Sequence, residues 1–164
     1  EYYYALGSLA GHKNFKWVRE VAARNPDKTF VVAGGKDLAA FGSAEADAAK
    51  NTSNIFYPGY VTDGQNKALM QNCKGFLHPA VFEGFGIPPL EALSLGAPIA
   101  LARASCLPEL YGDTARYFDP YDYDVDLDAL FAKPVTPPDK VLAKYSWEKT
   151  ARFWLDEIKK CAEA

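Results

Sequence analysis

Short apolar segments alternate with longer amphipathic segments along most of the chain. The short segments are rich in β-branched and aromatic residues, and they predict strands at residues 2–6, 29–33, 54–57, 75–78, 98–101 and 115–118. Strands that alternate with helices are typical of βα units, which build a parallel sheet. The pattern therefore predicts an α/β fold with a parallel sheet of about six strands flanked by helices.

The amphipathic segments predict the connecting helices, at about residues 14–23, 37–49, 63–72 and 88–96. Asn14 and Asp63 are the expected N-caps of the first and third helices, because short polar side chains accept hydrogen bonds from free amides there. Pro88 and Pro89 suit the first turn of the fourth helix, and Gly96 suits the position just past its end.

The pattern changes after Phe118, where five aspartates fall in a segment that also holds tyrosine and proline. This segment predicts a surface loop leading into a helix. Ser146 opens a terminal helix whose apolar residues have helical spacing, and we expect its aromatic face to pack in the core or against another domain. A single domain over residues 1–164 is expected, with a core to about residue 133 and a helical extension over 134–164.

Composition narrows the class of protein. The chain has 164 residues, a net charge of −3 and 49% hydrophobic residues, which suits one compact domain. The slightly acidic balance provides no basic field for nucleic acid, and no apolar run approaches the ~20 residues of a membrane span. Three widely spaced cysteines predict neither disulfides nor a zinc site. We therefore expect a cytoplasmic protein that binds no nucleic acid, and the first residue, Glu1, indicates a piece of a longer protein.

The strongest chemical signal lies at residues 82–93, between a predicted strand and a predicted helix. Ligands of open parallel sheets bind beyond the carboxyl ends of the strands, where this turn is expected. Gly84 and Gly86 allow close approach of a ligand, and free amides at a helix start favour a phosphate. Glu83 and Glu91 suit hydroxyl groups, so a nucleotide sugar would satisfy both. A tight turn with acids at a helix N-terminus explains the same residues without a ligand.

A second group of candidates follows the first predicted strand, at residues 7–14. Lys13 is a cation at the mouth of a helix, placed to neutralise a diphosphate. A lone loop lysine is most often a solvated surface charge, and only the shared sheet edge with Glu83 favours binding. His12 is a weaker candidate of the same kind, and His78 is either a donor in the pocket or a structural histidine. Motifs of metalloproteases, hydrolase elbows, calcium loops and dinucleotide folds are absent from the sequence, which gives those functions little support.

Taken together, these motifs resemble the donor-binding half of the family 4 retaining glycosyltransferases, which have the GT-B fold. Glu83 and Glu91 match that family's E-x7-E motif, and residues 7–14 resemble its glycine loop ending in Arg-Lys-Asn. Residues 59–61 are similar to its G-Y-V turn, and residues 146–148 to its closing helix. Further matches across residues 76–120 are Pro79, Pro88, Gly96-Ala97-Pro98, Leu107-Pro108-Glu109 and Asp119-Pro120.

The resemblance implies a Rossmann-like, C-terminal domain that binds a nucleoside diphosphate sugar, with GDP or UDP as the nucleotide. It implies retaining transfer of a hexose, without cofactor or metal, to a glycan or lipid-linked acceptor held by an N-terminal domain absent from this chain. Mannose and glucose are the expected donor sugars, for a polysaccharide or glycolipid product. We expect the fragment alone to be inactive, and peripheral association of the whole enzyme with the inner membrane face stays open.

The resemblance also assigns roles to residues. Glu83 would bond the donor sugar, Lys13 the diphosphate and Glu91 the ribose, and the first two are the catalytic candidates. The other donor-binding candidates are Ser8, His12, Tyr60, Val61, Gly84, Phe85, Gly86, Ile87 and Leu90. Tyr60 and Val61 would border the base.

The sequence departs from the family pattern at three positions. His12 and Ser8 stand where arginines are usual, and Ala80 stands where a serine is common. Fewer cations imply weaker or pH-dependent diphosphate binding. These departures leave a catalytically silent nucleotide-sugar-binding or interaction module of the same fold as the alternative. A nucleotide-sugar epimerase suits the predicted sheet but not the pairing of Lys13 with the two glutamates.

Overall fold

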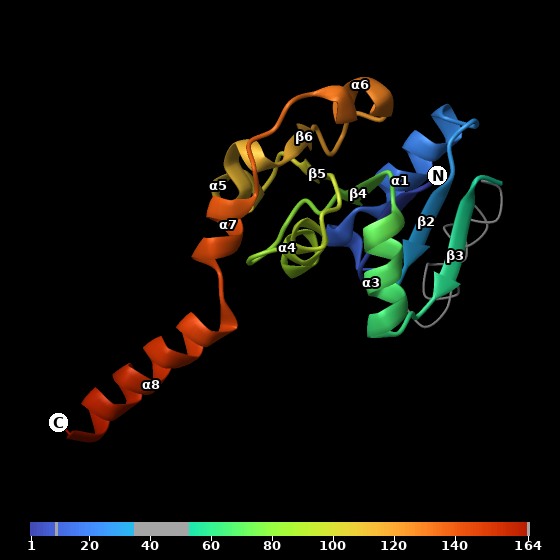
Figure 1. Ribbon diagram of the computed structural model, residues 1–164. Helices are drawn as coiled ribbons and strands as arrows, with labels where there is room; N and C mark the ends of the chain where they lie inside the picture. Colours follow the sequence, from blue (N-terminus) through green and yellow to red (C-terminus); the bar gives the residue numbers. More distant parts are fainter. Residues whose placement is uncertain (9, 35–52, 164) are drawn as a thin grey trace.

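The computed structural model describes residues 1–8, 10–34 and 53–163. Within these residues the chain forms a parallel sheet of six strands in the order β3-β2-β1-β4-β5-β6 (Figure 1). Their bounds are Tyr3–Leu6 for β1, Phe30–Ala33 for β2, Ile55–Gly59 for β3, Gly75–His78 for β4, Ile99–Ala102 for β5 and Arg116–Phe118 for β6. Each expected strand is confirmed, and each end lies within two residues of the expected one.

Helices connect the strands and flank the sheet (Figure 1). They are α1 Phe15–Arg24, α3 Asp63–Asn72, α4 Ile87–Ser94, α5 Leu107–Tyr111, α6 Leu127–Ala132, α7 Asp139–Lys144 and α8 Trp147–Glu163, with 3-10 turns η1 Gly11–Lys13 and η3 Gly112–Thr114. The helix expected over residues 37–49 lies outside the described residues. The short helices α5 and α7 were not expected, because a helix of one or two turns has too little periodicity to be recognised.

Large aromatic side chains fill the core on both sides of the sheet. Tyr4, Phe30 and Phe76 are fully buried on strands that are covered on both faces, as parallel strands generally are. The ring of Trp17 on α1 stacks on Phe118 of β6 with centroids 3.8 Å apart, and its indole nitrogen donates to the carbonyl of Asp122 at 2.7 Å. These contacts fix α1, and with it the loop that precedes α1, relative to the sheet.

The two expected helix caps are wrong in their chemistry. Asn14 holds the N-cap position of α1, but its φ is 53° and its side chain bonds no amide of that helix. The cap of α3 is Thr62 rather than Asp63, because the extended backbone of Thr62 lets its hydroxyl accept from Gln65 N, while Gln65 bonds back to the Thr62 amide. Asp63 is the first residue of the helix.

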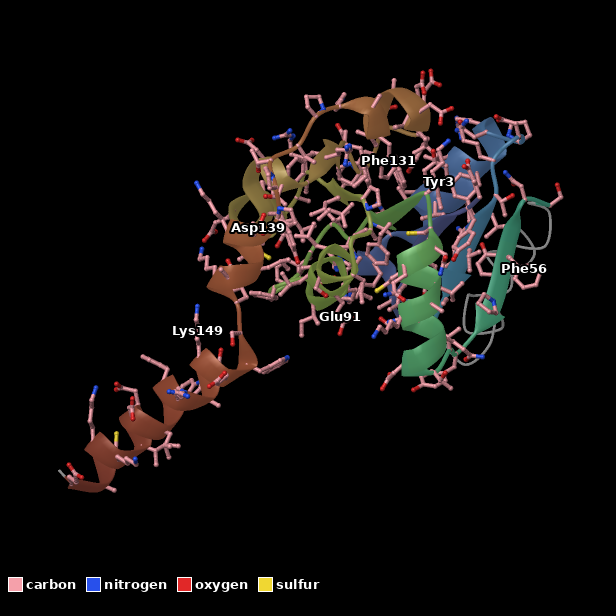
Figure 2. All side chains as sticks on the ribbon, viewed as in Figure 1. Tyr3, Phe56, Glu91, Phe131, Asp139 and Lys149 are labelled. Atoms are coloured by element: carbon pink, nitrogen blue, oxygen red, sulfur yellow. The ribbon has the colours of Figure 1, made fainter. Side chains whose placement is uncertain are left out.

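The terminal helix α8 extends away from the sheet (Figures 1 and 2). Lys149 Nζ near its start donates to the carbonyl of Ala143 on α7 at 2.6 Å. Trp147 is 82% exposed, and Trp154 and Ile158 are each about 60% exposed. Packing of this aromatic face in the core of the described chain is therefore excluded. Packing against another domain stays a prediction.

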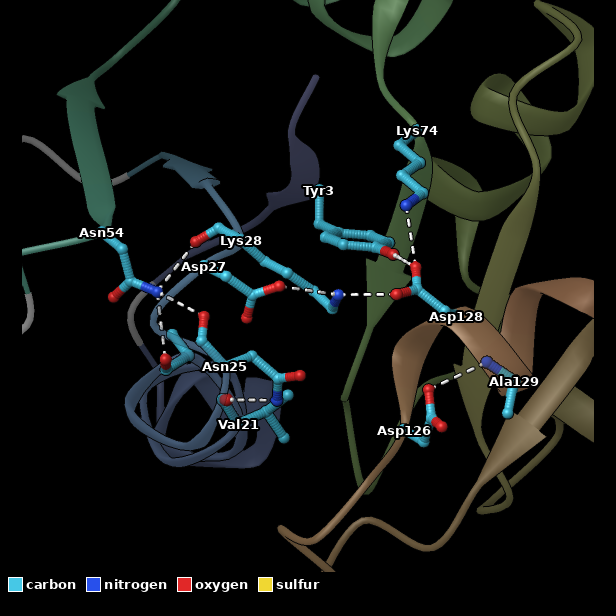
Figure 3. Close-up of polar contacts among 11 residues, drawn as sticks. Tyr3, Val21, Asn25, Asp27, Lys28, Asn54, Lys74, Asp126, Asp128 and Ala129 are labelled. Atoms are coloured by element: carbon cyan, nitrogen blue, oxygen red, sulfur yellow. Dashed lines mark hydrogen bonds and ion pairs between the residues drawn. The ribbon is translucent and has the colours of Figure 1, made fainter.

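An ionic network joins the amino ends of three strands (Figure 3). Asp128 on α6 accepts from Lys28 Nζ at 2.7 Å and from Lys74 Nζ at 2.8 Å, while the Tyr3 hydroxyl lies 3.4 Å from Oδ1. Lys28 precedes β2 and Lys74 precedes β4. The hydrogen bond from Lys28, followed by that from Lys74, lowers the pKa of Asp128 to about 2. This network lies at the end of the sheet opposite to the loops after β1 and β4.

Candidate functional site

The strand order places a topological switch point between β1 and β4, and we call the space between the loops that follow these two strands the donor crevice. The chain leaves β1 towards β2 on one side and leaves β4 towards β5 on the other, so the loops at residues 7–14 and 79–86 diverge at this point. Ligands of open α/β sheets bind at such a switch point, beyond the carboxyl ends of the strands. The two loops that the sequence singles out therefore flank the same crevice.

Backbone and side-chain hydrogen bonds hold these loops together. Val81 N donates to the carbonyl of His12 at 2.9 Å. The side-chain Nδ2 of Asn14 donates to the carbonyls of Pro79, at 3.2 Å, and Pro120, at 3.0 Å. Asn14 thus joins the loops that follow β1, β4 and β6. Sequence reasoning missed this role, and the only signal for it is that asparagine tolerates the left-handed conformation found here.

Three titratable side chains meet in the crevice. Lys13 Nζ lies 2.5 Å from Oε1 of Glu83, and His78 Nε2 lies 2.9 Å from the same oxygen. His78 is buried at the end of β4, and the side chains of Lys13 and Glu83 are only 19% and 12% exposed. Because an ionised carboxylate can only accept hydrogen bonds, Nε2 of His78 carries the proton in this contact.

This cluster keeps Glu83 ionised. The hydrogen bond from His78 is the largest cause, and together with the Lys13 hydrogen bond and both charges it outweighs the cost of burial, lowering the pKa of Glu83 to about 2. Glu83 is therefore a hydrogen-bond acceptor at neutral pH. The structure thus brings together Lys13 and Glu83, and it shows His78 as a donor to Glu83.

The segment that follows β5 holds the backbone of Glu83 by hydrogen bonds. Ser105 Oγ accepts from Glu83 N at 3.3 Å and donates to Glu83 O at 2.9 Å, and Cys106 Sγ lies 3.2 Å from that carbonyl. Ser105 has a φ of 53°, a conformation that serine adopts only at a cost. Sequence reasoning did not single out Ser105, because its contact crosses to a loop that follows another strand.

The start of α4 is fixed by Gly86. Its φ is 84°, and a Cβ at this position would lie 2.9 Å from a methyl group of Leu107. The Tyr111 hydroxyl donates to the Gly86 carbonyl at 2.6 Å, and the tyrosine is buried. Gly86 is thus confined by both its conformation and its neighbours, and Tyr111 fixes the backbone from which α4 begins.

The first turn of α4 offers fewer free backbone amides than a helix N-terminus usually provides. Pro88 and Pro89 occupy the second and third positions of α4 and carry no N–H. Within the described residues, the amides of Gly84, Phe85 and Gly86 have no protein acceptor. Anion binding would therefore rest on this loop and on Ile87, rather than on the first turn of the helix as a whole.

Glu91 lies apart from the Lys13–Glu83 cluster. It is exposed on α4 (Figure 2), and burial together with the charge of Asp63 at the start of α3 raises its pKa. Within the described chain no ion pair reaches it. Leu90, its neighbour on α4, packs partly against the core, and Ile87 is 47% exposed.

The remaining candidates line the same end of the sheet without contacting Glu83. Tyr60 and Val61 follow β3, where Gly59 has a φ of 74°. Tyr60 is 75% exposed, and Val61 packs partly against the core. Ser8 and His12 are exposed in the loop after β1. Among the described side chains, no group of three or more His, Cys, Asp or Glu is placed to hold a metal ion.

The sequence model of a known protein family, described as "Glycosyl transferases group 1", matches residues 1–129. The chain belongs to this family. This membership confirms that the chain is a glycosyltransferase domain of the kind that its motifs resemble, and members of the family use nucleotide-sugar donors.

Curated relatives of this group 1 domain include mannosyltransferases. The serotype-specific mannosyltransferase WbdA of Escherichia coli is 34% identical over 116 residues, which are 63% of this chain and 14% of that protein. O-antigen chain mannosyltransferase B of Escherichia coli is 41% identical over 70 residues, which are 43% of this chain and 18% of that protein. The chain thus spans only a small part of the length of these relatives.

Solved structures share the fold of this group 1 domain. The sucrose-phosphate synthase of Thermosynechococcus elongatus matches with a TM-score of 0.82 at 17% identity, over 99% of this chain and 46% of that chain. AviGT4, a glycosyltransferase of avilamycin A biosynthesis, matches with a TM-score of 0.74 at 16% identity, over 98% and 51%. The expected Rossmann-like fold of GT-B enzymes is confirmed. Among the described residues, no helix has the length and apolar character of a membrane span.

Proposed function

We propose that this chain is the donor-binding domain of a retaining hexosyltransferase of the family 4 type. A nucleoside diphosphate sugar binds in the crevice between residues 7–14 and 79–86, and the hexose passes to a glycan or lipid-linked acceptor. One observation carries the proposal: Lys13, Glu83 and His78 meet across the switch point, beside the loop amides of residues 84–86 that have no acceptor within the described chain.

Each part of the donor has a partner of matching chemistry. The ionised Glu83 accepts hydrogen bonds from hydroxyls of the donor sugar, and the loop amides donate to the sugar and phosphates. An ammonium group has three N–H donors, so Lys13 can bond Glu83 and the diphosphate at the same time. Glu91 accepts from the ribose hydroxyls, and the turn at residues 60–61 borders the base.

The chemical step needs stabilisation of the leaving diphosphate. Bond cleavage at the anomeric carbon leaves positive charge on the sugar ring and negative charge on the β-phosphate. Lys13 and the loop amides lie where that negative charge develops, and the carboxylate of Glu83 holds the sugar in position. No metal or cofactor enters this scheme. His12 is exposed in the same loop and offers a further hydrogen bond to the diphosphate.

Mannose is the donor sugar that the relatives favour. Both relatives described above are mannosyltransferases, and a third relative is an α-(1→4)-mannosyltransferase of Mycolicibacterium hassiacum. A solved TarM structure contains UDP. The proposed nucleotide is therefore UDP or the GDP that the family resemblance also allows. The acceptor would be bound by a part of the protein outside these 164 residues, because the relatives extend far beyond the matching region.

Calorimetric titration of the chain with UDP, GDP and ADP, and with their glucose, mannose and galactose conjugates, tests this function. We expect one nucleotide to bind. Glu91→Ala should lower the affinity for that nucleotide and its conjugates about tenfold or more, as the loss of a charged hydrogen bond implies. Glu83→Gln should weaken the sugar conjugate but not the bare nucleotide. Glu163→Gln on α8 removes the same charge far from the crevice and should change neither.

Absence of binding by every nucleotide, or equal affinities for all variants, would contradict the proposal for this chain. A transfer assay on the longer protein then separates enzyme from silent module. If Glu83→Gln abolishes transfer while the protein stays folded, the enzyme is supported. If the unaltered protein transfers no sugar from any of these donors, the departures at Ser8, His12 and Ala80 favour the silent module.

A further inference from the structure

A second cavity lies beside the edge strand of the sheet, away from the loops at residues 7–14 and 79–86. It has a volume of about 580 Å³ and opens beside the edge strand β6, between η3, the start of α5 and the segment at residues 133–136. None of its lining residues belongs to the loops at residues 7–14 or 79–86. Its size falls within the range of small-molecule pockets, roughly 300–1,000 Å³.

The charged residues that line this cavity are mostly cationic. Arg103, Arg116 and Lys133 contribute three positive charges, and Asp113 contributes the one negative charge. In the part of the chain that the structure describes, no ion pair joins these three cations to a carboxylate. Lys28 and Lys74 at the other end of the sheet differ, because both pair with Asp128. The cavity therefore has an excess of positive charge that the described chain does not neutralise.

Arg116 shows the need for an acceptor most directly. Its Nε is buried and has no hydrogen-bond partner among the described residues. A buried Nε is closed to a ligand, but the two terminal nitrogens of the same guanidinium are not among the buried atoms and form no hydrogen bond within the described chain. These terminal N–H groups can donate to an anion in the cavity.

The cationic groups are also held in fixed orientations. The guanidinium of Arg116 lies over the ring of Phe131, 5.6 Å from its centroid, and that of Arg103 lies over Tyr117 at 4.9 Å. Stacked guanidinium groups lose less conformational freedom on binding than free ones, and their planar N–H groups match two oxygens of one phosphate.

The wall that closes the cavity is attached to the domain. Thr136 N donates to the carbonyl of Asp113 at 2.9 Å, and the hydroxyls of Thr114 and Thr136 lie 3.2 Å apart. These bonds hold the segment at residues 133–136 against η3, so that Pro134 and Val135 face the cavity as an apolar wall.

We propose that this cavity binds a phosphate monoester, with the phosphate on Arg103, Arg116 and Lys133. The net charge of the lining suits a dianion, and the volume exceeds that of a bare phosphate ion. The organic part of the ligand lies against Pro134 and Val135. The monoester is either a soluble sugar phosphate or the headgroup of a lipid. This site is independent of the donor crevice, and its existence does not depend on the function proposed above.

Calorimetry of the whole 164-residue chain tests the site with mannose 6-phosphate, inorganic phosphate and mannose as probes. We expect saturable binding of the sugar phosphate and none of mannose. Arg116→Met removes the partly buried guanidinium, and Arg103→Gln combined with Lys133→Gln removes the two exposed cations. Each change should weaken binding at least tenfold. Lys140→Gln on α7, an exposed lysine outside the cavity, should leave it unchanged.

Two further measurements locate the ligand and its source. Lys13→Ala should leave the affinity for mannose 6-phosphate unchanged, because Lys13 lies in the donor crevice. Sedimentation with phosphatidylcholine vesicles, with and without phosphatidic acid, tests the lipid source. Binding of the soluble probe, or of phosphatidic acid vesicles alone, supports the site and identifies its source when the cavity variants abolish it. Because the double variant changes only exposed side chains, it serves as the test if Arg116→Met fails to fold.

Three results would overturn the proposal. The first is that neither mannose 6-phosphate nor phosphatidic acid vesicles bind to the chain. The second is binding that persists in both cavity variants. The third is binding that Lys13→Ala abolishes, which would place the ligand in the donor crevice. None of these results bears on nucleotide binding, which Glu91→Ala tests separately.

Discussion

Nε2 of His78 lies 2.9 Å from Oε1 of Glu83 and is the main reason that the pKa of this carboxyl is about 2. The histidine is buried at the end of β4, and Lys13 reaches the same oxygen from the loop after β1. A neighbour fixed by a strand loses less freedom in the contact than a long loop side chain. Glu83 is therefore ionised and oriented by the sheet itself.

Replacing His78 by phenylalanine should raise the pKa of Glu83 from about 2 towards its ordinary value of 4.5. Lys13→Met should raise it by less, because the hydrogen bond from His78 is the larger cause. A pH titration of the carboxyl carbon by NMR on ¹³C-glutamate-labelled protein measures both. A larger rise in Lys13→Met than in His78→Phe would contradict the assignment of His78 as the main partner.

Removal of the Asp128 network should cost stability only above strongly acidic pH. The pKa of Asp128 in the folded chain, about 2, is lower than its ordinary value of 3.8. Its contribution is therefore fully present above about pH 4 and is lost as the pH falls towards 2. We expect Asp128→Asn to lower the urea midpoint at pH 7 and to approach the unaltered chain as the pH falls below about 2.

Asp156→Asn on the exposed face of α8 is the matched control, since it removes one carboxylate that forms no ion pair among the described residues. Its midpoint should equal that of the unaltered chain at every pH. A pH-independent difference for Asp128→Asn would show that the ionic contacts of Asp128 do not stabilise the fold.

The strands could be predicted from the sequence because burial on both faces demands continuous apolar segments, as at residues 75–78 and 98–101. The caps could not be predicted as easily. Asn14 and Asp63 are good cap residues by type, but the Asn14 side chain donates its hydrogen bonds to distant loops, and the extended backbone of Thr62 precedes Asp63. The helical periodicity of α8 predicts an apolar face. It does not predict which surface packs against that face.

The candidate site was predictable where local spacing carries the signal. Glu83 and Glu91 stand in one motif, and Lys13 stands beside a predicted helix, so each could be named from the sequence. Ser105 and Tyr111 act through contacts with residues 22 and 25 positions away, and no pattern in the sequence links such pairs. The cationic cavity escaped for the same reason, because Arg103, Arg116 and Lys133 meet only in the folded chain.

Ser105 should affect donor binding more than stability. Ser105→Gly removes both hydrogen bonds to the Glu83 backbone but accepts the φ of 53° without strain. We expect the affinity for the nucleotide sugar to fall about tenfold, or about 1.4 kcal/mol, with a nearly unchanged urea midpoint. Ser105→Ala should be about 1–2 kcal/mol less stable than Ser105→Gly, because alanine adopts this φ unfavourably. Unchanged donor affinity in Ser105→Gly would show that the Glu83 loop needs no such support.

Loss of the Tyr111 hydroxyl should destabilise the start of α4. Tyr111→Phe keeps the buried ring but leaves the Gly86 carbonyl without its 2.6 Å hydrogen bond, at an expected cost of about 1–2 kcal/mol. Urea unfolding measures this cost. Tyr121→Phe removes a hydroxyl from a side chain that is 71% exposed and should have no effect. Equal midpoints for the two variants would show that the Gly86 carbonyl has an equivalent partner in water.

Asn14 should show separable effects of its side chain and its backbone. Asn14→Gly keeps the left-handed backbone accessible but removes both bonds to the loops after β4 and β6, at a cost of about 1–3 kcal/mol. Asn14→Ala should cost about 1 kcal/mol more, because alanine adopts a φ of 53° unfavourably. Both variants should weaken nucleotide binding, since Lys13 precedes Asn14 and depends on the same loop. If Asn14→Gly left both stability and affinity unchanged, the Val81 to His12 backbone bond alone would suffice to hold the crevice together.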